Sequence, residues 1–206
     1  MPSLLPIFFN GLVLGFSIAA PVGPIGVLCI RRTLAEGRLT GFLSGLGAAT
    51  ADMFYGALAA FGLTTLTSLL VEQRTWLAWI GGTFLVYLGV KTFLARPASQ
   101  AASAKGSGLP GAYLSTLALT LTNPMTILSF AAIFAGMQFN LSGSASAATL
   151  VAGVFLGSAA WWLTLSLLVG LLREKFTPLW MQWVNRIAGA IIFGFGLAVF
   201  FFNLHQ

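Results

Sequence analysis

Asp52 is the one acidic residue inside a long apolar stretch of this sequence. It stands near the middle of residues 39–70, which predict a membrane-spanning helix. A charged side chain at that depth costs at least ~2.5–3.5 kcal/mol, so such residues usually face a cavity and mark the path of an ion, a proton or a substrate. We therefore expect Asp52 to bind and release a proton or a cation. The alternative is a structural role, either a hydrogen bond or a salt bridge to Arg186.

Two prolines and a glycine interrupt the first apolar run. Pro21, Gly23 and Pro24 stand inside residues 4–30, an uncharged stretch long enough to cross a bilayer. Proline gives no N–H to a helix and its ring crowds the preceding turn. Lipid cannot satisfy the backbone groups that are freed, so the break has to face other helices or a wet cavity. Broken helices of this kind build the binding sites of carriers, whereas a simple proline kink is the plainer alternative.

A second break is predicted at Thr122, Asn123 and Pro124, near the middle of the apolar residues 111–136. The ends of half-helices present bare N–H groups to anions and bare carbonyls to cations. A zwitterionic amino acid carries one group of each kind, so two facing breaks together with Asp52 suit such a ligand. For Asn123 alone, a hydrogen bond between helices is the alternative.

The composition of the chain predicts a membrane protein with an all-α fold. Of the 206 residues, 58% are hydrophobic and only 7% are charged, too few charges to cover a soluble domain of this size. The apolar runs predict six transmembrane helices in a single integral membrane domain. Their expected ranges are 4–30, 39–70, 76–94, 111–136, 147–172 and 179–202.

The same composition weighs against several classes of function. The chain has one Cys, which allows no internal disulfide or dithiol pair. It has one His, His205, next to the last residue, which allows no histidine metal site within the chain. The acid pairs, Ser–His pairs and zinc motifs of intramembrane enzymes are also missing, so we expect a non-enzyme with no cofactor. The basic residues form no dense run, which disfavours nucleic acid as a partner. A structural or assembly protein remains an alternative, without a site at the two breaks.

Basic residues fall on alternate loops of the six predicted helices. Eight lie on the first, third and fifth loops, one lies on the second loop, and the termini have none. Because basic loops stay in the cytoplasm, both termini are predicted outside, in the periplasm of a bacterial inner membrane.

The two halves of the chain resemble each other. Residues 96–110, rich in Ala, Ser and Gly, predict a flexible linker between repeats at about 4–95 and 111–204. Each half has a proline break in its first helix and a Gly-x-x-x-Gly pair in its second, Gly41 to Gly45 and Gly153 to Gly157. The third helix of each half starts with Trp-x-x-Trp, Trp76 to Trp79 and Trp180 to Trp183. With three helices per half, the second repeat enters the membrane inverted. Inverted repeats are typical of alternating-access carriers.

At this point the sequence resembles the LysE/RhtB family of bacterial amino-acid exporters. The motifs that carry the resemblance, in chain order, are Pro21-Val22-Gly23-Pro24, the Arg-rich loop with Gly37, Gly41 to Gly47 with Asp52, Trp76 to Lys91, Asn123-Pro124, and Arg186 with Gly189 and Gly196. They cover nearly the whole chain. Many members of the family continue Asn-Pro with Lys in the fourth helix, whereas Met125 stands here, so the resemblance leaves substrate specificity open.

The resemblance implies a secondary transporter that exports an amino acid or a derivative across the inner membrane, with protons or another cation as coupling ion. Asp52 would bind that ion. Pro21, Gly23 and Pro24 would form one wall of the site, and Thr122, Asn123 and Pro124 the other. Membrane lipid surrounds such a protein, and a homodimer is compatible with it. The alternative within the same class is an exporter of metal or other inorganic ions, which predicts more intramembrane carboxylates or thiols than one Asp and one Cys.

Overall fold

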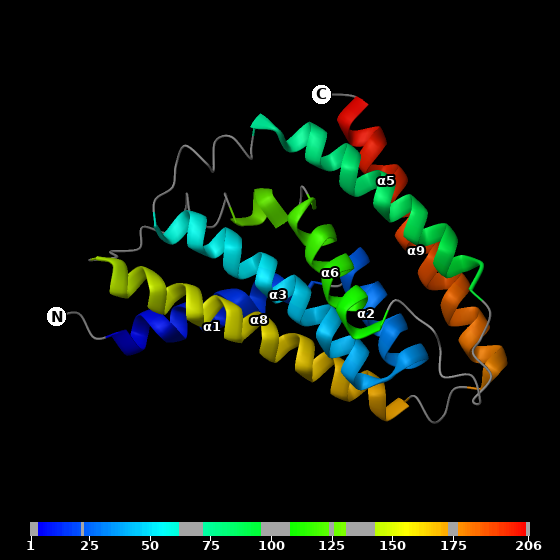
Figure 1. The fold of residues 1–206 in the computed structure, drawn as a ribbon, viewed down its shortest axis with the longest axis horizontal. Helices are drawn as coiled ribbons and strands as arrows, with labels where there is room; N and C mark the ends of the chain where they lie inside the picture. Colours follow the sequence, from blue (N-terminus) through cyan, green and yellow to red (C-terminus); the bar gives the residue numbers. More distant parts are fainter. Residues whose placement is uncertain are drawn as a thin grey trace.

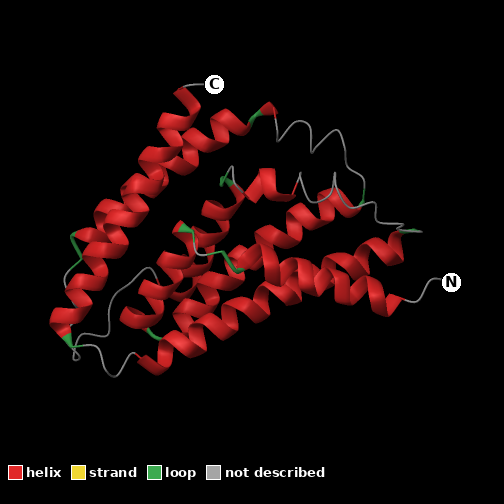
Figure 2. Ribbon diagram, turned by 180° about the vertical axis from the view of Figure 1, so that it is seen from behind, coloured by secondary structure: helices red, strands yellow, loops and turns green. Residues whose placement is uncertain are grey.

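The computed structural model describes residues 4–21, 23–61, 72–95, 108–123, 126–130, 143–172 and 177–204. Over these ranges the chain is helical and has no strand, as Figure 1 and Figure 2 show from opposite sides, in agreement with the predicted all-α fold. The helices are α1 (Leu4–Ala19), α2 (Pro24–Glu36), α3 (Arg38–Ala60), α5 (Arg74–Phe93), α6 (Gly108–Leu121), α8 (Ser144–Leu172) and α9 (Pro178–Leu204).

Three of these helices are long and apolar enough to cross a bilayer unaided. The segments are Thr75–Phe93, Ser144–Leu172 and Gln182–Phe201, and α1 with α2 makes a fourth if the bent pair is counted as one span. The axes of α1 and α2 differ by 82°. Many large apolar side chains on the helices are exposed, Leu5 and Trp76 among them, as a lipid-facing surface requires. The arrangement of six spans as an inverted repeat goes beyond these helices and stays a prediction.

The observed boundaries correct the first and third predicted loops. α2 continues to Glu36, so Arg31 and Arg32 are helical residues and do not lie in a loop. Arg and Glu favour helix, and Gly37 is the first residue that ends it. α6 begins at Gly108, inside the expected linker. The rest of that linker, and the predicted helical residues 62–70 and 131–136, lie outside the described ranges.

The corner between α2 and α3 depends on glycine. Gly37 has φ 106°, a conformation that side chains with a Cβ rarely adopt, and its N–H donates to the carbonyl of Thr33 at 3.1 Å. A Cβ at Gly41 would overlap the side chain of Thr33. The chain therefore reverses in one residue, and the last turns of α2 pack directly on the first turns of α3.

Helices from the two halves of the chain pack on one another. α1 lies along α8, α8 along α3, and α3 along α6, while α5 and α9 form a separate antiparallel pair (Figure 1). α2 lies among these groups and contacts α3, α8 and α9. α2, which begins at the break after α1, therefore packs against helices of both halves.

Candidate functional site

The first break separates α1 from α2 at the predicted prolines. α1 ends at Ala19 and α2 begins with Pro24 in its first turn, where the missing N–H costs no hydrogen bond. The Gly23 N–H donates to the carbonyl of Pro21 at 3.0 Å, which forms a tight turn across the gap. No side chain caps α2 at Gly23, so the N–H groups of its first turn lack an intrahelical or side-chain cap.

The second break follows the end of α6 at Leu121. The Thr122 N–H still donates to Ala118, and the Asn123 N–H reaches the carbonyl of Thr120 at 3.3 Å, which closes the last turn. The carbonyl of Asn123 then accepts the N–H groups of Thr126 and Ile127 at 3.1 and 3.2 Å, and thus begins a new helical segment over residues 126–130. Pro124, predicted as part of this wall, lies outside the described residues, as does Met125.

The two breaks meet at one small pocket. Pro24 from the first break and Thr122 with Asn123 from the second all line it. The remaining lining residues come from α2, α5, α6 and α9: Ile25, Gly81, Gly82, Leu85, Leu119 and Val199. The pocket is narrow, with enclosed room for about one water molecule, and the wider space of about 250 Å³ around it includes open solvent. The two glycines of α5 are site residues that sequence reasoning did not single out. A Cβ at Gly81 would stand 2.8 Å from the carbonyl oxygen of Thr122, so its absence lets α5 approach the second break.

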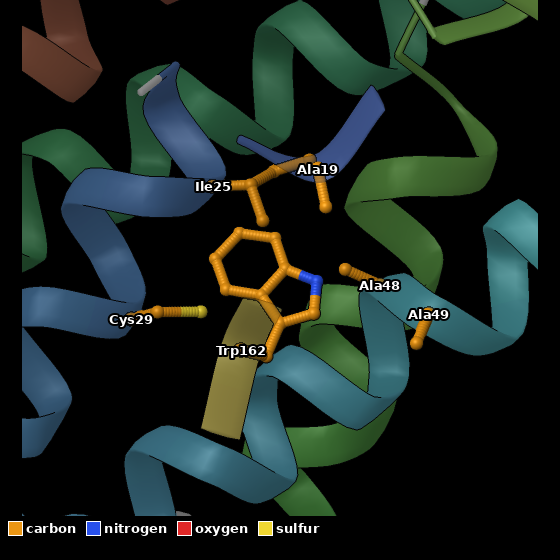
Figure 3. Close-up of a cluster of buried hydrophobic side chains, with 6 residues drawn as sticks. All are labelled: Ala19, Ile25, Cys29, Ala48, Ala49 and Trp162. Atoms are coloured by element: carbon orange, nitrogen blue, oxygen red, sulfur yellow. The ribbon is translucent and has the colours of Figure 1, made fainter. Parts of the chain in front are cut away.

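The other predicted residues of the first break do not line this pocket. Pro21 is exposed, and a Cβ at Gly23 would meet no atom within 4 Å. Ala19 and Ile25, on either side of the break, belong instead to a buried apolar cluster around Trp162 of α8. Figure 3 shows Ala19 and Ile25 on one side of the Trp162 ring, with Cys29 and Ala48 at its two flanks. Cys29 is fully buried there, in line with a packing role.

Asp52 is buried inside the protein, at the contact between α3 and α8. Its side chain is 3% exposed, and the hydroxyl of Ser158 donates to its Oδ2 atom at 2.7 Å. It therefore does not point into lipid. The alternative partner, Arg186, is exposed and has its guanidinium over the ring of Trp183. Asp52 is not among the residues that line the pocket.

Tyr55 connects the helix of Asp52 to the second break. It stands about one turn beyond Asp52 on α3, is 4% exposed, and donates a hydrogen bond of 2.5 Å from its hydroxyl to the carbonyl of Leu121. That carbonyl belongs to the last turn of α6, where helix ends leave carbonyls without intrahelical donors. Sequence reasoning missed Tyr55. The signal for it was a phenol three residues after a buried acid, a pattern too common to stand out.

Arg32 is a second buried charge, and sequence reasoning placed it in a loop. Its side chain is 6% exposed. Its Nη1 atom donates to the hydroxyl of Ser44 at 3.0 Å, to the carbonyl of Ala112 at 2.9 Å and to the hydroxyl of Thr116 at 2.9 Å. Its Nη2 atom donates to the hydroxyl of Ser115 at 2.8 Å. One guanidinium on α2 thus binds both α3 and α6.

Chemically, the pocket offers backbone groups at two helix breaks with hydroxyl and amide side chains, and the protein holds one buried carboxyl, Asp52, outside the pocket lining. These groups can bind a small polar or zwitterionic solute and a proton. Across the parts of the chain that the structure describes, no three His, Cys, Asp or Glu side chains gather to hold a metal ion.

Comparison with known proteins finds relatives that are named membrane and efflux proteins. The chain is 27% identical to the "Putative amino acid efflux protein YcgF" of Bacillus subtilis (strain 168) over 197 residues, which cover 92% of this chain and 93% of that protein. It is 30% identical to the "Uncharacterized membrane protein YahN" of Escherichia coli (strain K12) over 182 residues, 86% of this chain and 81% of the relative. It is 24% identical to the "Threonine efflux protein" of Salmonella typhi over 205 residues, 94% and 97% of the two chains.

No solved structure matches the chain. The family model described as LysE type translocator matches residues 16–201, a range that holds both helix breaks, Asp52 and the pocket. The chain therefore belongs to the LysE type translocators, and it is a membrane transporter and not an enzyme.

Proposed function

We propose that this protein is a secondary carrier that exports an amino acid, or a close derivative, across the bacterial inner membrane. The observation that carries the proposal is the pocket in which Pro24 of one broken helix meets Thr122 and Asn123 of the other. Relatives that match nearly the full length of the chain are named amino acid and threonine efflux proteins, which supports this class of substrate.

The substrate would be bound by backbone groups at both breaks. The uncapped first turn of α2 suits the carboxylate of an amino acid, because a helix N-terminus carries a partial positive charge. The end of α6, with Thr122 and Asn123, supplies carbonyl and side-chain oxygens that suit the ammonium group. A zwitterion placed between the two ends would satisfy groups that lipid cannot.

Asp52 would carry the coupling proton, in exchange for the substrate. The carboxyl is buried, and its hydrogen-bonded neighbour Ser158 comes from the other half of the chain. A proton that binds at this contact changes the charge at a junction between the two halves, which is where a carrier needs coupling between ion binding and conformational change.

Alternating access between two inverted repeats, about 4–95 and 111–204, is part of the proposal. In such a repeat α1 corresponds to α6, α3 to α8 and α5 to α9. The packing supports it, because the α1–α8 contact then has its counterpart in the α6–α3 contact, and the α5–α9 contact is its own counterpart. At the α5–α9 contact, a Cβ at Gly89 would crowd the backbone of Phe193, and a Cβ at Gly196 would crowd that of Val86. Both pairs of counterparts, Gly89 with Gly196 and Val86 with Phe193, are 107 residues apart.

The orientation follows from the basic residues, with both termini in the periplasm. In Figure 1, α2, α5 and α8 end toward the lower right, and α3, α6 and α9 begin there, whereas both termini lie away from that end. The arginines at 31, 32 and 38 belong to this same end. We assign it to the cytoplasm because basic segments are retained on that side.

Reconstitution in liposomes tests the proposal directly. Vesicles loaded with one unlabelled amino acid at a time, threonine first, should take up the same labelled amino acid by counterflow for at least one member of a panel of twenty. Vesicles with the Thr122→Trp protein, whose pocket is filled, should lose the exchange. Thr164→Trp, at an exposed position of α8, is the matched control and should retain it. The proposal is wrong if no amino acid of the panel shows counterflow and divalent metal ions show it instead.

A further inference from the structure

Arg32 lies between the pocket and one end of the helix assembly. On α2, Leu28 separates Arg32 from Pro24 at the pocket, and on α6, Leu119 separates Thr116 from Thr122. Both leucines belong to one buried apolar cluster, here called the leucine plug: Leu28, Leu85, Leu88, Leu119 and Ile192. From the end where α2 finishes and α6 begins, the order is therefore Arg32 and its partners, the leucine plug, and the pocket.

The partners of Arg32 divide between the two halves of the chain. Ser44 belongs to the first half, together with Arg32 itself. Ala112, Ser115 and Thr116 belong to the second half and lie 80 to 84 residues further along the chain. Three of the four hydrogen bonds to neighbouring groups thus join the halves, at the end that we assign to the cytoplasm.

The charge of Arg32 has only neutral acceptors among the described residues. The neighbouring carboxylate of Glu36 forms its ion pair with Arg31, at 3.5 Å. A buried guanidinium without an ion pair of its own depends on its hydrogen bonds, and each hydrogen bond to a charged group contributes about 1.5–3 kcal/mol. Movement of α6 away from α2 would break several of these bonds at once. The guanidinium is therefore stable when all its hydrogen bonds are made and also when water surrounds it. A half-open state, with the bonds broken and no water at the charge, has a higher free energy.

We propose that Arg32 is the cytoplasmic gating residue of this carrier. Its guanidinium holds α2, α3 and α6 together over the leucine plug while the pocket is closed to the cytoplasm. It is released to water when the halves separate there. The planar fork of Arg suits this role, because one side chain can donate to two helices at the same time. This inference rests on the proposed function, which supplies the need for the halves to separate.

Side-specific thiol labelling tests the gate without a transport measurement. The single cysteine is first removed with Cys29→Ser, and Thr122→Cys then places a thiol at the pocket. Inside-out and right-side-out membrane vesicles expose opposite faces to a membrane-impermeant maleimide. Arg32→Ala should raise the labelling rate at least about tenfold from one face only, since losing roughly 1.4 kcal/mol from the closed state shifts its population by that factor. The expected face is the cytoplasmic one.

Arg31→Ala is the matched control. Arg31 is the adjacent residue with the same charge. It also reaches the second half of the chain, at Asn185 of α9, but its hydrogen bonds to Asn185 and Glu36 do not involve α3 or α6, the helices that Arg32 holds over the leucine plug. Labelling should stay at the parent rate in this variant. If Arg32→Ala does not fold, the pair Ser115→Ala with Thr116→Val removes two acceptors on α6, leaves the arginine in place and should give the same one-sided increase.

Three results would overturn the gating role: no change in labelling, an equal increase from both faces, and an equal increase in Arg31→Ala. A one-sided increase supports the gate whichever face it comes from, and the face itself tests the orientation. Counterflow by the parent protein tests the proposed function separately, so that failure of one can be distinguished from failure of the other.

Discussion

Asp52 and Arg32 are both buried, and both are held by uncharged groups that lie far away in the sequence. The Asp52 carboxylate accepts from Ser158, 106 residues away, and the Arg32 guanidinium donates to hydroxyls and a carbonyl of α6. Neutral partners let each charge change its surroundings without breaking an ion pair, which costs less when the protein changes conformation. These two residues are therefore the first places to look for coupling between binding and movement.

Replacing Asp52 by Asn should separate exchange from proton coupling. The amide keeps the size of the side chain and a hydrogen bond to Ser158, but it cannot take up a proton. We expect counterflow of the amino acid to continue while uptake driven by an imposed pH gradient falls to the level of empty liposomes. Glu72→Gln, at an exposed position, removes the same charge and should leave pH-driven uptake intact. A pH-driven rate in Asp52→Asn equal to the parent rate would eliminate the coupling role.

Replacing Tyr55 by Phe should destabilise the protein by about 0.5–1.5 kcal/mol, because it leaves the carbonyl of Leu121 without that donor. The change should appear as a lower Tm of the protein in detergent. Tyr87→Phe is the control, since Tyr87 is 55% exposed and should have no effect on Tm. Equal Tm values for all three proteins would mean that the hydrogen bond contributes no stability.

At the scale of the helices, glycine determines which elements can touch. A Cβ at Gly157 of α8 would overlap the carbonyl oxygen of Leu12 on α1, and one at Gly47 of α3 would overlap that of Tyr113 on α6. Helices in lipid gain little from the hydrophobic effect and depend on close packing, so small residues mark their contacts. Gly153 and Gly157 are the Gly-x-x-x-Gly pair in the second predicted helix of the second half, and both lie against α1.

Gly157→Ala should therefore destabilise the α1–α8 pair. Overpacking of a close contact costs typically about 1–3 kcal/mol, because one backbone has to move. Thermal unfolding of the variant in detergent should show a lower Tm. Gly194→Ala on α9 is the control, since a Cβ there would meet no atom within 4 Å and alanine favours helix. If the Tm of Gly157→Ala equals or exceeds that of the Gly194→Ala protein, close packing at this position is not required.

At the scale of the whole molecule, one end of the assembly is basic and the two termini lie away from it (Figure 1). With the basic end in the cytoplasm, a C-terminal alkaline phosphatase fusion should be active and a C-terminal green fluorescent protein fusion should be dark. Fusions truncated after residue 100, within the predicted third loop, should give the opposite pair of signals. A fluorescent full-length fusion would place the C-terminus in the cytoplasm and reverse the proposed orientation.

The sequence by itself determined the environment of this protein and the positions of its breaks. Seven per cent of charged residues cannot cover a soluble surface, and Pro24 cannot continue a helix, whatever else the chain does. It also indicated that Asp52 is buried, because an isolated charge in an apolar run has to be sheltered from lipid. These properties depend on composition and on local covalent chemistry.

Only the tertiary structure decided which groups meet. The contact of Asp52 with Ser158, the bond from Tyr55 to the end of α6, and the burial of Arg32 depend on how each helix is rotated and how closely its neighbours approach. A basic residue at the end of an apolar run predicts the side of the membrane on which that end lies, but not its partners. Partners more than 60 residues apart in the chain are chosen by packing, and packing depends on all the helices together.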